Sequence, residues 1–542
     1  MAREALGLRR LLPGQEEGVA SVIGGRDTLA LLPTGGGKSA IYQLAGVDRP
    51  GATIVVSPLI ALQRDQLEAL DAHDIGGAAA LNSTLPEPER AAVLDDFVAG
   101  RLEFLLLGPE QLSSTDVVER LAAANVSLFV VDEAHCVSEW GHDFRPEYRR
   151  LGEVARVLGR PPILALTATA SPAVRDEIVE WLGMRDPLVV ARGFDRPNLR
   201  LEVRTFADDG SKRRAALDLV RESSGAAIVY AATRRAAEDL AAELAADGID
   251  AAAYHAGLPA GRRSEVQDAF RADGIRVVVA TIAFGMGIDK PNVRLVVHLD
   301  VPDGLDAYHQ EIGRAGRDGE PASATLLYRA EDLGLRRFQG APAVVEEADV
   351  RAVLRMLGRG GGTTAEIATA TRRSRRRTEA IVSRLEALGA ARVTHDGVVS
   401  LHEDVDRMGL AAQVVAAQER RRRLAQSRVE MLRGYAESPG CRRRYLLNYL
   451  GEEYEPPCGS CDRCAAAGTA AAASTSPVVV DETSGPFALN DRVRHAKYGP
   501  GLVSRVEGDR IVVLFDDVGY RTLDLEACLT GGLLVAADHG VD

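Results

Sequence analysis

Short apolar runs rich in Val, Ile and Leu alternate with polar, helix-forming stretches from the start of the chain to about residue 335. This alternation is typical of parallel sheets whose faces are covered by helices. It predicts two consecutive α/β lobes that meet near residues 193–197. The predicted strands are 29–32, 53–57, 104–107, 128–131 and 163–167 in the first lobe, and 226–230, 275–280 and 295–299 in the second.

Beyond residue 341 the pattern changes to helices followed by a hairpin. The pair Asp396-Gly397 lies between two short apolar runs and favours a tight type I′ turn. Three helices and a hairpin predict a winged-helix-like domain. The predicted helices are 350–357, 364–370 and 375–388, and the hairpin strands are 392–395 and 398–401.

The C-terminal part begins with a segment of biased composition. Residues 467–485 are mostly Ala, Ser, Thr and Pro, which cannot bury enough surface to fold alone, so they are predicted to be a flexible linker. After it, short strands are separated by turns at 499–501, 508–509 and 516–517, a spacing that predicts a small β-barrel.

The length of 542 residues is too great for one core and by itself predicts two to four domains. Neither an apolar run of membrane-spanning length nor a signal peptide is seen, so we expect a cytoplasmic protein with no membrane contact. The predicted domains are a first lobe (1–193), a second lobe (194–340), a winged-helix-like domain (341–402), a cysteine-containing module (403–466), a linker (467–485) and a barrel (486–530).

The net charge of -13 argues against general coating of nucleic acid, because phosphate binding needs surplus Lys and Arg. Any DNA contact is therefore expected on a local basic track. Arginine runs occur at 372–377, 420–423 and 442–444, but a chain with four Lys among its 65 basic residues produces such runs by composition. Solvated helix faces are the equal alternative.

A glycine-rich segment, residues 33–39, directly follows a predicted strand and precedes a helical stretch. Phosphate-binding loops lie between a strand and a helix in this way. Their glycines let backbone N–H groups approach phosphate oxygens. Leu32 stands where the general pattern has Gly, and a glycine turn without nucleotide is the alternative. We expect Lys38 to reach the β- and γ-phosphates and Ser39 to bind Mg²⁺. The residues predicted to hold ATP here are Thr34, Gly35, Gly36, Gly37, Lys38 and Ser39.

Two acids, Asp132 and Glu133, follow the predicted strand 128–131. Open parallel sheets bind ligands at the carboxyl ends of their strands. We therefore expect Asp132 to bind Mg²⁺ and Glu133 to polarise the attacking water. Surface acids are the alternative.

Gln310, Arg314 and Arg317 lie at helical spacing in the second lobe. Phosphoryl transfer needs positive charge on the developing transition state, and arginines often supply it. These residues predict a nucleotide in the cleft between the lobes, where hydrolysis would open or close them. Surface arginines are the alternative if the partner motifs are absent.

These residues together resemble the superfamily 2 helicases, which have two RecA-like lobes. The stretch 136–148 is similar to the aromatic-rich loop of the RecQ family, with Glu139 where many relatives have Gln. The resemblance extends through 166–170, 254–257 and 280–291. It implies that DNA is contacted by Trp140, His142, Phe144 and Arg145, with the aromatic rings available for base stacking.

Gln15 matches the glutamine that reads adenine in such helicases. The aromatic residue and the arginine expected just before Pro13 are Leu11 and Leu12 here, which puts base selectivity in doubt.

Six cysteines are too few for a disulfide scaffold, and four of them cluster as metal ligands do. Cys441, Cys458, Cys461 and Cys464 resemble the RecQ zinc module, and four thiolates can close a tetrahedral structural Zn²⁺ site. Cys136 and Cys528 are expected to be unliganded. The common RecQ order places a winged helix after the zinc module, whereas here the winged-helix candidate precedes it. The hairpin at Asp396-Gly397 is therefore a candidate for the strand-separating pin.

The segments 491–501 and 512–516 resemble the Tudor-like barrel that ends UvrD-type helicases, where it can bind RNA polymerase. An SH3-like barrel of other ancestry is the alternative.

The resemblance implies an ATP-dependent 3′–5′ DNA helicase acting in repair or recombination, with ATP, Mg²⁺ and Zn²⁺ as cofactors. Its substrates would be single-stranded, forked or 3′-tailed DNA. An RNA helicase, and a DNA-stimulated ATPase or adaptor that recruits a transcription partner through the barrel, are the alternatives.

Overall fold

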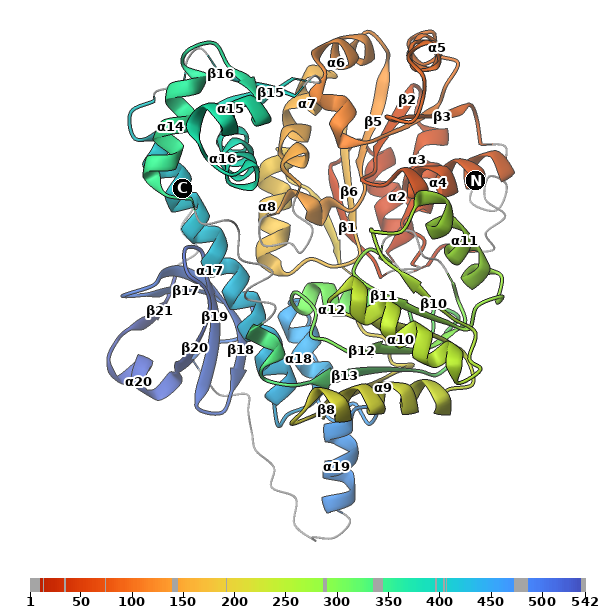
Figure 1. Ribbon diagram of the computed structural model, residues 1–542, viewed down its shortest axis with the longest axis vertical. Coiled ribbons are helices and arrows are strands. Elements are labelled where there is room, and N and C mark those ends of the chain that lie inside the picture. The colour runs from red at the N-terminus through yellow and green to blue at the C-terminus, as the bar shows by residue number, and fades with distance from the viewer. Residues whose placement is uncertain are drawn as a thin grey trace.

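The computed structural model of the chain describes residues 10–537, apart from 13, 34–35, 74, 139–144, 192, 286–289, 335–344, 395–396, 403–404, 406 and 472–485. Two sheets, a helical segment with its own small sheet, a long helix and a C-terminal sheet follow one another along the chain (Figure 1). Among the described residues, no helix is long and apolar enough to cross a membrane.

Lobe one is built on a parallel seven-stranded sheet in the order β3-β4-β2-β5-β6-β1-β7. Its central strands are almost entirely buried, because helices cover both faces. The strands are β1 (Thr28–Leu31), β2 (Ala52–Val56), β3 (Ala78–Leu81), β4 (Phe104–Leu107), β5 (Val126–Val131), β6 (Ile163–Thr167) and β7 (Leu188–Ala191). The helices are α2 (Gln15–Ile23), α3 (Ser39–Asp48), α4 (Ile60–Ala72), α5 (Glu87–Val98), α6 (Thr115–Ala122), α7 (Leu151–Val157) and α8 (Pro172–Leu182).

Lobe two repeats this plan with six parallel strands in the order β10-β11-β9-β12-β13-β8. Its strands are β8 (Leu199–Thr205), β9 (Ala226–Tyr230), β10 (Ala251–Tyr254), β11 (Val277–Ala280), β12 (Val293–His298) and β13 (Ala322–Tyr328). Its helices are α9 (Asp209–Glu222), α10 (Arg234–Ala246), α11 (Ala260–Arg271) and α12 (Leu305–Ile312).

Five of these strands, β3, β7, β8, β10 and β13, are not predicted by the apolar runs. Four of the five lie at the edges of their sheets. Edge strands are covered less completely, so they need fewer apolar residues. β3 and β10 each begin with three alanines, which favour helix over strand.

The helical segment after lobe two carries a three-stranded sheet in the order β14-β16-β15. Its elements are α14 (Glu347–Leu357), β14 (Gly362–Thr363), α15 (Thr364–Thr371), α16 (Arg375–Ala387), β15 (Ala391–Val393) and β16 (Val398–Leu401). β15 and β16 pair antiparallel, and Gly397 at their turn has a φ of 77°. Asp396 lies outside the described residues. This segment, called the winged segment below, lies beside α7 and α8 of lobe one (Figure 1).

A 28-residue helix, α17 (Leu410–Glu437), runs from the winged segment to lobe two and spans about 42 Å. Its residues 419–423 are exposed, whereas its two ends contain buried apolar residues. The helices α18 (Arg442–Tyr449) and α19 (Asp462–Ala471) follow. α19 extends into the first residues of the predicted linker, so that prediction is wrong for 467–471, where alanines favour helix.

The C-terminal module is an antiparallel sheet in the order β20-β19-β18-β17-β21. The last strand returns beside the first, which is how a meander curls toward a barrel. The module packs on α17 and α18. Its elements are β17 (Arg492–His495), β18 (Gly499–Glu507), β19 (Arg510–Phe515), β20 (Gly519–Asp524), α20 (Leu525–Thr530) and β21 (Leu534–Ala536). The predicted fold class is confirmed: two parallel-sheet lobes, a helical region, a four-cysteine cluster and a C-terminal antiparallel sheet.

Candidate nucleotide site and zinc centre

The glycine-rich loop joins the carboxyl end of β1 to the start of α3, as the sequence predicts. The loop turns through a hydrogen bond from the Gly36 N–H to the Pro33 carbonyl (2.8 Å), and Gly37 has a φ of 62°. Lys38 Nζ lies 3.3 Å from the carbonyl oxygen of Leu32 and 3.5 Å from that of Pro33. Thr34 and Gly35 lie outside the described residues, and Ser39 is the first residue of α3.

The Gln15 amide holds this loop from the first turn of α2. Its Nε2 donates to the carbonyl oxygens of Gly36 (2.9 Å) and Gly37 (3.0 Å), and its Oε1 accepts from the Leu12 N–H (2.7 Å). Gln15 is 3% exposed, so the amide is fixed by burial as well as by hydrogen bonds. A Cβ at position 37 would lie 2.4 Å from Gln15 Nε2, which explains why Gly is required there.

Asp132 follows β5 and is 6% exposed. Its carboxylate accepts hydrogen bonds from the Glu133 N–H (3.0 Å) and from Gln66 Nε2 (3.2 Å). Burial, with a smaller effect of Glu133, raises the pKa of Asp132 to about 6. The ammonium of Lys38 opposes this rise, so it lies within electrostatic range of the carboxylate. Gln66 is a site residue that the sequence did not reveal, because a polar residue on a helix such as α4 has many ordinary roles.

The charges of both lobes meet at Lys38. Burial lowers the pKa of Lys38, while Glu133 and Asp132 raise it and Arg317 of lobe two lowers it further. Charged groups of both lobes therefore lie close enough to Lys38 to shift its pKa.

His135 connects Glu133 to the end of β6. Its Nδ1 lies 3.3 Å from Glu133 Oε2 and 3.0 Å from Thr167 Oγ1. Burial opposes a charge on this ring, but Cys136 and Glu133 together raise the pKa of His135 well above its usual value. Glu133 itself has a φ of 48°, a left-handed conformation that few non-glycine residues adopt. His135 was not among the predicted site residues, although its place two residues after Glu133 was a visible signal.

Arg314 and Arg317 lie just beyond the end of α12 in lobe two. Arg314 is 3% exposed and Gln310, on α12, is 8% exposed. The Tyr230 hydroxyl donates to the Phe284 carbonyl at 3.0 Å. Burial raises the pKa of Tyr230, and the charges of Arg314 and Arg317 oppose that rise. Both arginines therefore lie within electrostatic range of the carboxyl end of β9.

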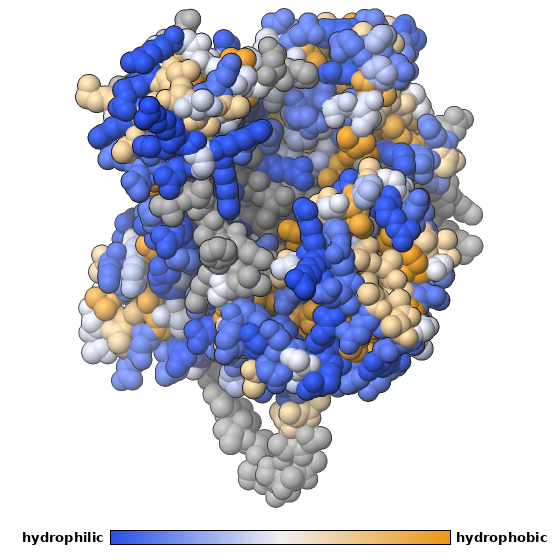
Figure 2. Space-filling view, in the orientation of Figure 1, coloured by the Kyte–Doolittle hydropathy of each residue, from blue (hydrophilic) through white to orange (hydrophobic). Residues whose placement is uncertain are grey.

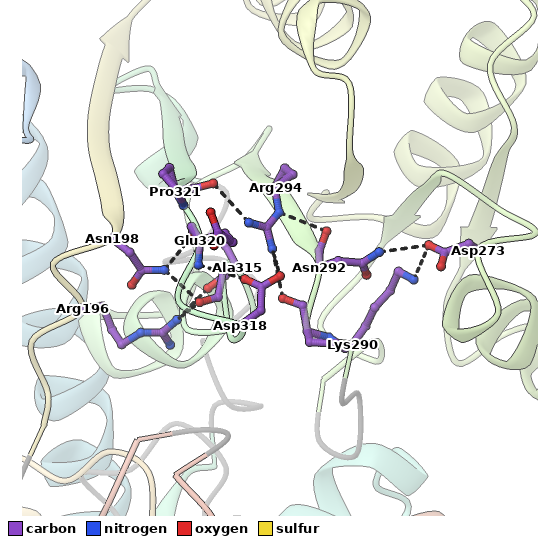
Figure 3. Close-up of polar contacts among 12 residues, drawn as sticks. Arg196, Asn198, Asp273, Lys290, Asn292, Arg294, Ala315, Asp318, Glu320 and Pro321 are labelled. Carbon is purple, nitrogen blue, oxygen red and sulfur yellow. Dashed lines mark hydrogen bonds and ion pairs between the residues drawn. The ribbon is translucent and has the colours of Figure 1, made fainter.

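Hydrogen bonds from neighbouring segments hold the backbone around these arginines (Figure 3). Asn198 Nδ2 donates to the carbonyls of Gly316 (2.8 Å) and Glu320 (2.9 Å). Arg294 forms an ion pair with Asp318 at 2.5 Å, and Lys290 forms one with Asp273 at 2.6 Å. Arg196 also donates to this backbone, so the arginine loop is fixed to the sheet on more than one side.

The aromatic-rich loop is only partly described. Trp140, His142 and Phe144 lie outside the described residues. Arg145 is partly exposed, and its Nη1 donates to the Pro58 carbonyl at 3.0 Å, at the end of β2. The loop therefore ends beside the carboxyl edge of the lobe-one sheet. Figure 2 shows a hollow between the lobes and the winged segment, with hydrophilic side chains around it.

The four clustered cysteines come together, as predicted. The sulfur atoms of Cys441, Cys458, Cys461 and Cys464 all lie within 4.8 Å of one another, and those of Cys458 and Cys464 are 3.8 Å apart. Tetrahedral Zn²⁺ with Zn–S bonds of about 2.3 Å places its sulfur ligands about 3.8 Å apart, so this donor set fits zinc. The interaction between Cys461 and Cys441 lowers the pKa of Cys461 and raises that of Cys441, so one of these two thiols loses its proton before the other. Cys136 and Cys528 are buried elsewhere.

Family models match three segments of the chain. The DEAD/DEAH box helicase model matches residues 12–178, and the helicase conserved C-terminal domain model matches residues 211–319. The RecQ zinc-binding model matches residues 402–465. The matches cover the two lobes and the cysteine cluster, which are the parts that carry the site.

Two bacterial relatives match most of the chain. It is 37% identical to a probable ATP-dependent DNA helicase RecS of Bacillus subtilis, over 84% of this chain and 88% of the relative. It is 36% identical to the ATP-dependent DNA helicase RecQ of Pasteurella multocida, over 84% of this chain but only 60% of the relative. The chain therefore spans less than two thirds of the second relative.

Solved structures of low identity share the fold. The DUF1998 helicase MrfA bound to DNA has a TM-score of 0.54 at 16% identity, covering 74% of this chain and 62% of that chain. The Lhr helicase of Mycobacterium smegmatis bound to single-stranded DNA and AMP-PNP has a TM-score of 0.50 at 22% identity, covering 76% of this chain and 60% of that chain. Both similarities concern the fold alone.

Proposed function

The chain belongs to the RecQ family of ATP-dependent DNA helicases, and from this premise we propose that it moves 3′ to 5′ along single-stranded DNA and unwinds duplex DNA. The observation that carries the proposal is the position of the motifs: the loop with Lys38 joins the carboxyl end of β1 to α3, and Asp132 and Glu133 follow β5 in the same parallel sheet. Two lobes that share one nucleotide pocket can convert bond cleavage into relative motion.

The nucleotide would be held mainly by lobe one. Gln15 lies against the loop and would contact adenine, and backbone N–H groups of 34–39 would cradle the phosphates. Lys38 would neutralise the β- and γ-phosphates. Ser39 and Asp132 would hold Mg²⁺, which offsets phosphate charge when bound. Asp132 is buried and lies within electrostatic range of Lys38, which supports its assignment as a Mg²⁺ ligand.

Glu133 would orient the attacking water and accept its proton. Its contact with His135, and through it with Thr167, fixes the carboxylate relative to the sheet. Gln310, Arg314 and Arg317 would face the γ-phosphate from lobe two and stabilise the charge that develops there. Because this charge comes from the other lobe, hydrolysis would require the lobes to be closed.

Single-stranded DNA would cross the carboxyl edges of the two sheets. Trp140 and Phe144 would stack on bases, a contact worth about 1–3 kcal/mol per base. His142 and Arg145 would contact the strand beside them. The position of Arg145 at the end of β2 supports this path.

The cysteine cluster would hold a structural Zn²⁺ ion, because four thiolates leave no open coordination position. The hairpin of β15 and β16 remains our candidate for the strand-separating pin. Shortening it by removing residues 394–398 should reduce unwinding of forked DNA while DNA-stimulated ATP hydrolysis continues. Unchanged unwinding would contradict this role.

A protein partner would bind the C-terminal module. Leu529, Leu533 and Val535 are 43%, 41% and 51% exposed, and they lie on α20, β21 and the turn between these elements. The Tudor-like resemblance suggests RNA polymerase as the partner. Purified RNA polymerase should bind the intact chain and should not bind the L533S/V535S variant. Absence of binding to the intact chain would exclude RNA polymerase as the partner.

Strand displacement on forked, 3′-tailed and 5′-tailed duplexes tests the proposed function. We expect ATP-dependent displacement of the forked and 3′-tailed substrates, and none by Lys38→Ala or Glu133→Gln. ATP hydrolysis should be stimulated by single-stranded DNA more than by RNA of the same sequence. Full activity of both variants would contradict the motor, and stronger stimulation by RNA would favour an RNA helicase.

A further inference from the structure

Arg196, in the segment that joins the two lobes, holds the backbone from which the lobe-two arginines project. Its Nη1 donates to the Gly313 carbonyl (3.2 Å), and its Nη2 donates to the carbonyls of Ala315 (2.9 Å) and Gly316 (2.8 Å). One guanidinium therefore fixes carbonyls on both sides of Arg314 and immediately before Arg317 (Figure 3). The planar fork of an arginine can bind three carbonyls at once, which a lysine ammonium cannot reproduce in the same geometry.

The backbone at this point tolerates little movement. Gly316 has a φ of 57°, and a Cβ there would lie 2.4 Å from Asn198 Nδ2 and 2.8 Å from the Glu320 carbonyl oxygen. The loop is thus closely packed on one side and held by Arg196 on the other. A shift of about 1 Å in a catalytic group can cost about a hundredfold in rate, so this restraint matters for chemistry.

The residue before Arg196 is held by the zinc module. Arg443 of α18 is 4% exposed, and its Nη1 pairs with Asp195 Oδ1 at 2.5 Å. Its Nη2 donates to the Leu199 carbonyl (2.7 Å) and to Ser460 Oγ (3.0 Å). Arg443, a single side chain of the zinc module, therefore binds residues on both sides of Arg196 in the lobe-joining segment.

The same contacts reach the cysteine cluster. Ser460 Oγ lies 3.8 Å from Cys458 Sγ, and the backbone around Cys461 forms a parallel β-bridge with Leu201 of β8. The Leu201 N–H donates to the Ser460 carbonyl at 3.3 Å. The loop that supplies Cys458 and Cys461 is thus attached directly to β8, a few residues after Arg196.

We propose that Arg196 is a positioning residue for Arg314 and Arg317, and that Arg443 ties its placement to the cysteine cluster. The zinc module then acts on ATP hydrolysis through the lobe-joining segment, in addition to stabilising its own fold. This inference rests on the proposed function, since it assigns Arg196 to the ATPase cycle.

The test compares Arg196→Lys with Arg204→Lys in the full-length protein. Arg204 lies on β8, shortly after Arg196, and is likewise partly buried. Its guanidinium donates to Glu202 (2.7 and 3.4 Å), not to the arginine loop, which makes it a matched control. We expect Arg196→Lys to lower the kcat of DNA-stimulated ATP hydrolysis about tenfold or more, with the KM for ATP and the Kd for single-stranded DNA changed less than about twofold. Arg204→Lys should behave as the wild type.

Two fluoride complexes separate positioning from general structural damage. ADP with aluminium fluoride mimics the transition state, and ADP with beryllium fluoride mimics the ground state. Arg196→Lys should weaken binding of the first and leave the second unchanged. Equal effects on both complexes, or a kcat equal to that of the wild type, would overturn the inference. A wild-type chain that fails to hydrolyse ATP would instead overturn the proposed function.

A double-mutant cycle tests the connection to the zinc module. Arg443→Lys should lower kcat in the same way while the protein keeps one zinc per chain, measured by elemental analysis. Arg196 and Arg443 would affect kcat through the same chain of contacts. The kcat of the double variant should therefore fall by much less than the product of the two single-variant fold losses. Losses that multiply fully would show two independent effects and contradict the proposed path.

Discussion

The ionisable side chains in the pocket shift one another's pKa. Burial and Arg317 lower the pKa of Lys38 while Glu133 and Asp132 raise it, and burial with Glu133 raises the pKa of Asp132 to about 6. Sequence motifs identified these residues because each motif has a fixed relation to a strand end. They did not identify Gln66 or Arg196, whose contacts depend on how distant segments pack.

His309 gives a pH prediction at the same scale. Burial lowers its pKa to about 4 from the usual 6.5, and its Nε2 lies 3.2 Å from the Phe194 carbonyl. Between these two values the unfolded chain binds the proton and the folded chain does not, so stability falls as the pH falls from 6.5 towards 4. The stability that comes from keeping the His309 ring buried and neutral is fully present above pH 6.5.

Replacing His309 with Gln should therefore reduce the fall in Tm between pH 7.5 and 5. The measurement is thermal unfolding of both proteins across this range. His73→Gln, at an exposed ring, serves as the control and should keep the wild-type slope. Identical slopes for wild type and His309→Gln would contradict the prediction.

At the scale of elements, the sequence predicted the central strands better than the edges. Strands such as β2 and β5 are mostly apolar because helices cover both of their faces. β8 alternates Leu, Arg, Leu, Glu, Val, Arg and Thr, which is a strand signal of its own, but an edge strand gives no long apolar run. The alanine-rich β3 and β10 give no strand signal at all, because only their place beside β4 and β11 determines their structure.

The cysteine cluster gives a prediction for the element that it holds. Cys461→Ser should lose most of the bound zinc and lower the Tm by several degrees, because structural zinc typically contributes about 10–16 kcal/mol of binding energy. Zinc content and thermal unfolding measure both effects. Cys528→Ser, a buried cysteine outside the cluster, should keep its zinc. Full zinc content in Cys461→Ser would exclude this ligand.

At the scale of the whole molecule, the C-terminal module touches both the zinc module and lobe one. Arg505 lies 3.9 Å from the centre of the Tyr445 ring, and the Tyr520 and Tyr449 rings are 5.6 Å apart. Arg492 pairs with Asp176 of α8 at 2.6 Å. The sequence predicted this module as a separate barrel beyond a linker and gave no sign of its docking, because these contacts join residues up to 316 positions apart.

Ending the chain at Ala471 should therefore lower the Tm, since removal of the module exposes Tyr445 and Tyr449. Each kcal/mol of lost stability corresponds to about 2–4 °C in a domain of 150–250 residues. DNA-stimulated ATP hydrolysis should persist, because the pocket residues belong to the two lobes. A truncated protein with an unchanged Tm would show that the docking contributes no stability.

In the proposed mechanism, lobe one binds the nucleotide and arginines of lobe two contact its γ-phosphate. A structure of the chain with Mg²⁺, ADP–aluminium fluoride and single-stranded DNA tests this most directly. The account predicts that Arg314 and Arg317 lie within hydrogen-bonding distance, about 3 Å, of the fluoride group that replaces the γ-phosphate. A closed complex in which both guanidinium groups remain outside the pocket would contradict it.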